Sequence, residues 1–112
     1  MHRYNIKITY SAEQDLENAA DYIAFHLKNP PAATNTVKGI RRQIDTLQTF
    51  PERNELDEDP ILSNYGVRRD YYKNYKIFYI VENDTIYIIR ILHMLADSRS
   101  RLYRTLKISD DF

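Results

Sequence analysis

The side chains of this sequence that could act chemically are mainly basic, and they gather in the second half of the chain. Residues 65–107 hold 9 Lys and Arg against 4 Asp and Glu, whereas residues 1–64 hold 7 against 10. Arg and Lys offer positive donors that bind phosphate oxygens. The distribution predicts a local positive surface on a chain whose net charge is zero. That surface could meet a nucleic acid, or it could be a charge asymmetry without a function.

Most other kinds of site lack the residues that they need. The chain has no Cys, which excludes disulfides, thiol catalysis and Cys-ligated zinc. Its 3 histidines, His2, His26 and His93, lie far apart and lack the i, i+4 spacing of helical metal ligands. No GxGxxG, P-loop or GxSxG motif is present. We therefore expect no metal site and no cofactor.

The first half of the chain predicts a strand followed by two helices. Residues 3–9 alternate between apolar and polar side chains, as a half-buried strand does. Ser11 and Gln14 have the spacing of a capping box at the start of a helix. Pro30–Pro31 must end that helix near Lys28, and Pro31 can open the next one, which ends at Pro51. The apolar residues that recur at helical spacing are Ala12, Leu16, Ala19, Ile23 and Leu27 in the first helix, and Ala33, Val37, Ile40, Ile44 and Leu47 in the second.

The second half predicts three strands and a short helix. Residues 75–82 and 85–93 are apolar at nearly every position, which indicates central strands joined by a turn at Asn83–Asp84. Residues 67–72 form a further strand, and residues 96–107 a short C-terminal helix. Residues 52–64 are acidic and aperiodic, so we expect an irregular loop whose composition is compatible with disorder. We predict a single domain over residues 1–112 with an α+β fold of order β-α-α-β-β-β, in which a helical hairpin packs on a mainly antiparallel sheet in two layers.

Two segments carry a resemblance to a known family. The first is SAEQDLENAADYIAFHLKNPPAATNTVKGIRRQIDTLQTFP, and the second is GVRRDYYKNYKIFYIVENDTIYIIRILH. With their order of elements they resemble the RelE/ParE superfamily of toxins from type II toxin–antitoxin modules, and the helical half is most similar to the ParE branch. The resemblance implies a growth inhibitor that is neutralised by a cognate antitoxin. It also implies one of two targets, DNA gyrase for ParE-like members or mRNA on the ribosome for RelE-like members.

The resemblance also implies candidate site residues. If the chain is a metal-free endoribonuclease, the catalytic residues are Arg69, Lys76, Arg99 and Tyr103. The residues that would bind the target or a nucleic acid are Arg68, Arg69, Lys73, Arg90 and His93. Nuclease members of the superfamily carry an essential Arg just after the last strand, but residues 94–98 read MLADS and contain none.

Most of these candidates also have a structural interpretation. Arg68, Arg69 and Lys73 could protect a sheet edge from aggregation. Arg90, in an apolar strand, is better explained as a buried partner for an acid of the helical layer, and His93 as a structural histidine at a strand end. Arg99 and the other basic residues of the C-terminal helix could be solvated charges that suit the helix dipole.

Three functions therefore remain open from sequence alone. We favour a ParE-like gyrase poison over a RelE-like ribosome-dependent nuclease, and an inactive antitoxin-binding module is the third possibility. We expect the antitoxin to fill an exposed apolar groove between the helical hairpin and the sheet. No apolar run is long enough to span a bilayer, and the N-terminus lacks the pattern of a signal peptide, so we expect a cytoplasmic protein that does not contact a membrane.

Overall fold

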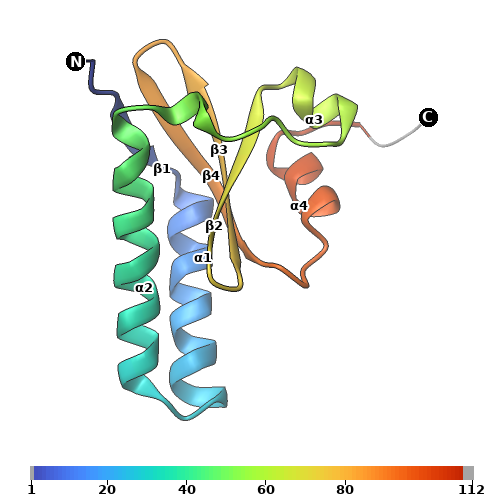
Figure 1. The fold of residues 1–112 in the computed structure, drawn as a ribbon. Helices are drawn as coiled ribbons and strands as arrows, with labels where there is room; N and C mark the ends of the chain where they lie inside the picture. Colours follow the sequence, from blue (N-terminus) through green and yellow to red (C-terminus); the bar gives the residue numbers. More distant parts are fainter. Residues whose placement is uncertain (1, 110–112) are drawn as a thin grey trace.

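The computed structural model describes residues 2–109, which form one sheet with helices packed against it (Figure 1). The strands lie in the order β1-β4-β3-β2, with β1 parallel to β4 and the other pairs antiparallel. The strands are β1 (Asn5–Ile8), β2 (Val67–Tyr72), β3 (Tyr75–Glu82) and β4 (Thr85–His93), and the helices are α1 (Tyr10–Asp21), α2 (Pro30–Asp45), α3 (Pro60–Asn64) and α4 (Ser98–Thr105). The predicted α+β fold and its order of elements are confirmed.

The helical hairpin of α1 and α2 covers one face of the sheet. Its closed end contains a π-helical turn, η1 (Tyr22–His26), and extends beyond the turn between β2 and β3 (Figure 1). The core on this face joins apolar side chains of both helices to those of β3 and β4; its buried members include Leu16, Ile40, Ile44, Ile77, Tyr79 and Ile88. Leu27 departs from the predicted stripe, because it follows η1 and is 57% exposed.

The opposite face of the sheet is covered by the two short helices. Leu62 of α3 and Leu102 and Tyr103 of α4 are buried against Val67, Phe78, Ile89 and Leu92 of the sheet. Both central strands, β3 and β4, are thus buried on both faces, as their continuous apolar sequences predicted. Asn83 in the turn between them has a φ of 55°, which an Asn tolerates.

Both helix caps of the hairpin differ from the prediction by one or two residues. The hydroxyl of Thr9, and not Ser11, accepts a hydrogen bond from the N–H of Ala12, so α1 begins at Tyr10. The same hydroxyl donates to the carbonyl of Ile88 in the middle of β4, so this strand fixes where the helix begins. Asn29 caps α2 by accepting from the N–H of Ala32, and Pro30 is the first helical residue in place of Pro31.

The prediction of an irregular loop over residues 52–64 is wrong. The segment begins within a 3-10 turn, η3 (Pro51–Arg53), and ends in α3, so only residues 54–59 form the expected irregular loop. Tyr79 anchors it, because its phenol donates to the carbonyl of Pro51 at 2.6 Å and accepts from the side chain of Asn54 at 3.0 Å. Because Tyr79 belongs to the sheet and is distant in sequence, no local sequence pattern could reveal these two hydrogen bonds. Over residues 2–109, no helix combines the length and apolar character that crossing a membrane requires.

Candidate functional site

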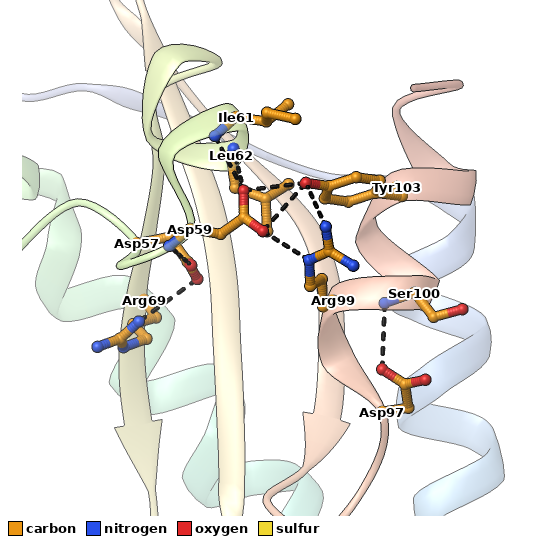
Figure 2. Close-up of polar contacts among 9 residues, drawn as sticks. All are labelled: Asp57, Asp59, Ile61, Leu62, Arg69, Asp97, Arg99, Ser100 and Tyr103. Carbon is orange, nitrogen blue, oxygen red and sulfur yellow. Dashed lines mark hydrogen bonds and ion pairs between the residues drawn. The ribbon is translucent and has the colours of Figure 1, made fainter. Parts of the chain in front are cut away.

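A carboxylate at the start of α3 lies at the centre of the polar cluster on the α4 face of the sheet (Figure 2). One oxygen of Asp59 accepts the backbone N–H groups of Ile61 and Leu62 at 2.9 and 3.1 Å. Its other oxygen accepts from Nε of Arg99 at 2.7 Å. The phenol of Tyr103 lies 3.0 Å from both oxygens and donates to the carboxylate. Asp59 therefore joins α3 to α4.

The protonation of this cluster follows from its contacts. Burial alone would raise the pKa of Asp59, but hydrogen bonds from Arg99, Tyr103 and two backbone N–H groups outweigh it, and the pKa is lowered. Burial and the hydrogen bond to Asp59 raise the pKa of Tyr103. The hydrogen bond to Asp59 also raises the pKa of Arg99. At neutral pH the cluster thus holds a carboxylate, a protonated phenol and a guanidinium.

The guanidinium of Arg69 is held by the two acidic residues before Asp59. It lies 3.4 Å from a carboxylate oxygen of Asp57 and 3.3 Å from one of Glu58. Its Nε also donates to the phenol of Tyr71 at 3.0 Å. The side chain of Asp57 is only 12% exposed, so this ion pair is partly shielded from water. Carboxylates of one short acidic segment therefore pair with three of the candidates for RNA cleavage, Arg69, Arg99 and Tyr103.

Lys76, the fourth nuclease candidate, lies on the same face of the sheet. It stands two residues before Phe78 on β3, and Phe78 packs in the core beneath α4. Lys76 is half-buried, and it makes no ion pair with any residue from 2 to 109.

The residues predicted to bind a target do not form one patch. Arg68 donates to the backbone carbonyls of Asn54 at 2.6 Å and Glu52 at 3.4 Å, so it holds the segment before α3. Lys73 lies in the turn between β2 and β3, with Nζ 5.5 Å from the centre of the Tyr72 ring.

Arg90 is the partly buried partner of an acid of the helical layer, a pairing that its position in an apolar strand predicted. Its Nε and Nη2 each lie 2.8 Å from a carboxylate oxygen of Asp15 in α1, and its Nη1 donates to Thr105 of α4. Asp15 also accepts the backbone N–H of Ile91 at 2.9 Å. This bond satisfies a donor on the edge of β4 beyond the point where β1 ends. Hydrogen bonding to Asp15 raises the pKa of Arg90.

His93 lies in a groove between the helical hairpin and the sheet, at the position predicted for a docking site. The groove has a volume of about 240 Å³ and is lined mainly by apolar atoms. Its walls include Tyr22, Ile23 and Leu27 of the hairpin, Tyr75 and His93 of the sheet, and Lys73 of the turn between β2 and β3. The rings of His93 and Tyr75 lie nearly perpendicular to each other, and Nδ1 of His93 accepts the N–H of Leu95 at 3.1 Å. Tyr22 and Leu27 are 51% and 57% exposed, which leaves apolar surface open to a partner.

Sequence reasoning missed the acidic members of the site. The aperiodic sequence of residues 52–64 places Asp57, Glu58 and Asp59 in a loop, although Asp59-Pro60 has the pattern of a helix N-cap followed by proline at the first helical position. That signal could have located α3, but not the contacts of Asp59 with α4. Within residues 2–109, no three His, Asp or Glu side chains gather as a metal site would require.

The sequence matches the model of a protein family described as the ParE toxin of the type II toxin–antitoxin system parDE, over residues 6–97. The chain belongs to the ParE toxin family. The match includes the whole helical hairpin, strands β2 to β4 and all of β1 except Asn5. It ends before α4, so Arg99 and Tyr103 lie outside it.

Solved structures agree with this assignment. The ParE-family chain is similar to one from the chromosomal ParDE toxin–antitoxin system of P. aeruginosa, with 26% identity and a TM-score of 0.70, over 83% of this chain and 98% of the other. A chain of the toxin–antitoxin complex RelBE2 from Mycobacterium tuberculosis shares the fold, with 21% identity and a TM-score of 0.61, over 83% and 93% of the two chains. A search of curated protein sequences gave no match.

Proposed function

We propose that this ParE-family toxin arrests growth in the cytoplasm by binding a protein target, DNA gyrase, and that a cognate antitoxin neutralises it. The observation that carries the proposal is that the carboxylates of Asp57, Glu58 and Asp59 form ion pairs and hydrogen bonds with the side chains that RNA cleavage would use. Membership of the ParE family supports the same choice of target.

The chemical argument concerns what a metal-free nuclease needs. Such an enzyme must take a proton from the 2′-OH, stabilise negative charge on the phosphate and protonate the leaving oxygen. Arg69 and Arg99 could stabilise the phosphate, but each already faces a carboxylate. Tyr103 donates a hydrogen bond to Asp59 and has a raised pKa, so it keeps its proton at neutral pH and is a poor proton acceptor. A phosphate that approached this cluster would meet negative charge.

The groove beside His93 supports a protein partner. A cognate antitoxin could place an amphipathic helix or an added strand against the exposed side chains of Tyr22 and Leu27. The two similar solved chains come from toxin–antitoxin systems, which is consistent with such a partner.

A ribosome-dependent nuclease is the second candidate, and one observation favours it. Arg69, Lys76 and Tyr103 all lie on the face of the sheet that α4 covers, as a basic and aromatic RNA site would require. For this function Asp59 would have to release Arg99 and Tyr103 when RNA binds.

Two reactions with the purified chain test the choice. We expect the toxin to inhibit supercoiling of relaxed plasmid by DNA gyrase and to leave mRNA intact in a reconstituted translation reaction. Tyr103→Phe removes the phenol oxygen but keeps the buried ring, and Tyr65→Phe makes the same change at a tyrosine that is 49% exposed. Both variants should inhibit gyrase as the original chain does.

The opposite result would establish the nuclease. It would be mRNA cut in the ribosomal A site by the original chain and by Tyr65→Phe, lost in Tyr103→Phe and Lys76→Ala, with gyrase unaffected. Co-expression with the product of the neighbouring gene should restore growth under either mechanism.

A further inference from the structure

The helical hairpin has a second apolar groove, which is lined by hairpin residues alone. It consists of two adjoining hollows of about 460 and 280 Å³, which share Ala20 and Val37. Small side chains form its floor, chiefly Ala20, Ala24 and Ala33, and Phe25 stands at the closed end with 74% of its surface exposed. Small residues allow another helix to approach closely. This groove is separate from the one beside His93.

Charge is divided across this groove. On the α1 side it is bordered by Glu13, Glu17 and Asp21, and on the α2 side by Lys38 and Arg41, all of them exposed. No Lys or Arg occurs in α1, and the only acid of α2 is Asp45 at its end. Glu13 and Arg41 pair across the groove at 2.8 Å. Glu17, Asp21 and Lys38 make no ion pair within the described part of the chain, residues 2–109.

We propose that this groove binds a second copy of the chain, so that two hairpins form an antiparallel four-helix bundle. A two-fold axis parallel to the helices places α1 of each copy against α2 of the other, and it keeps every residue at its own height along the hairpin. Asp21 and Lys38 border the same hollow, as do Glu17 and Arg41. The symmetry therefore brings Asp21 of one copy to Lys38 of its partner, and Glu17 to Arg41.

The alternative symmetry is unfavourable. A two-fold axis perpendicular to the helices would set α1 against α1, with Glu13 opposite Asp21, and like charges in such an interface repel. Facing helices are antiparallel under either axis, so the side-chain charges decide between the two symmetries. Phe25 would be covered in this arrangement, and apolar burial along the seam would supply most of the affinity.

Sedimentation of the purified full-length chain over a range of concentrations tests the proposal. We expect a monomer–dimer equilibrium that weakens as salt is raised, because the charge pairs lie at the rim. Asp21→Lys reverses one charge at both symmetry-related positions and should weaken dimerisation by roughly tenfold or more. The double variant Asp21→Lys/Lys38→Asp exchanges the two charges and should restore it.

Asn18→Lys is the matched control, because Asn18 is an exposed residue of α1 that does not line the groove. It should leave the equilibrium unchanged, and circular dichroism should show that all variants fold. Ala24→Arg fills the groove and should abolish the dimer. A chain that stays monomeric at every concentration overturns the proposal, as does a dimer that Asp21→Lys and Ala24→Arg leave intact. A monomer whose Ala24→Arg variant no longer binds its antitoxin also overturns it and assigns the groove to the antitoxin.

Discussion

Replacing Arg90 by Met should destabilise the fold by about 3 kcal/mol or more, because it leaves the charge of Asp15 buried without its partner. The side chains of Asp15 and Arg90 are only 8% and 16% exposed, and two hydrogen bonds of 2.8 Å join them. After the substitution, Asp15 keeps its hydrogen bond from the N–H of Ile91 but loses both hydrogen bonds from Arg90. A domain of this size has a total stability of about 5–15 kcal/mol, so the loss is a large fraction.

A double-mutant cycle separates the ion pair from the packing. Asp15→Leu alone should be as harmful as Arg90→Met, since it leaves a partly buried guanidinium that retains only Thr105. Asp15→Leu/Arg90→Met removes both charges but leaves the N–H of Ile91 without its acceptor, which should lower the free energy of unfolding by about 1–3 kcal/mol. We therefore expect the double variant to lose much less than the roughly 6 kcal/mol obtained by adding the two single losses.

Urea unfolding followed by circular dichroism measures these differences. The control is Arg41→Met, which breaks the exposed pair of Arg41 with Glu13 and should cost less than about 1 kcal/mol. The reasoning fails if Arg90→Met is no worse than Arg41→Met, or if the two single losses simply add. The folded double variant also tests whether Arg90 binds the target. Toxicity that survives in it assigns Arg90 a structural role, whereas lost toxicity with an intact fold assigns it to the target site.

Two further predictions concern packing and acid stability. A Cβ added at Gly39 would lie 2.1 Å from the phenol oxygen of Tyr72, so Gly39→Ala should destabilise by about 1–3 kcal/mol in urea, although Ala favours a helix. The same change should be stabilising in a Tyr72→Ala background, and equal losses in both backgrounds would contradict the steric cause. The lowered pKa of Asp59 means that its contribution is complete above the ordinary aspartate pKa of about 3.9 and is lost as pH falls through the lowered value. Asp59→Asn should therefore make the free energy of unfolding fall less steeply as the pH is lowered through this range. An unchanged pH dependence would contradict the role given to Asp59.

The strands and the helical hairpin could be predicted because their signals are local. Residues 67–72, 75–82 and 85–93 are the bounds of β2, β3 and β4 as the structure has them, since apolar β-formers are interrupted by turn residues. The first helix cap was misplaced because Thr9 and Ser11 are both suitable residues. The choice depends on Ile88 of β4, whose carbonyl accepts from Thr9, and nothing in the local sequence conveys that contact.

The candidate site was harder to predict because its partners are distant in sequence. Arg90 was expected to pair with an acid of the helical layer, since a charge in an apolar strand needs one. Which acid it meets could not be inferred, because Asp15 lies 75 residues away. Tyr103 and Asp59 lie 44 residues apart, and their contact depends on the packing of α3 and α4 against one sheet face.

The uneven charge of the two halves therefore does not translate directly into a positive surface. Three of the basic candidates pair with acids from the first 64 residues: Arg69 with Asp57, Arg90 with Asp15, and Arg99 with Asp59. The fold uses part of the charge difference to join segments that are far apart in the chain. A nuclease would have to separate Arg69 and Arg99 from their carboxylates before they could bind phosphate. A toxin that docks on a protein can keep those contacts intact, so neutralised cations are compatible with binding but work against RNA cleavage.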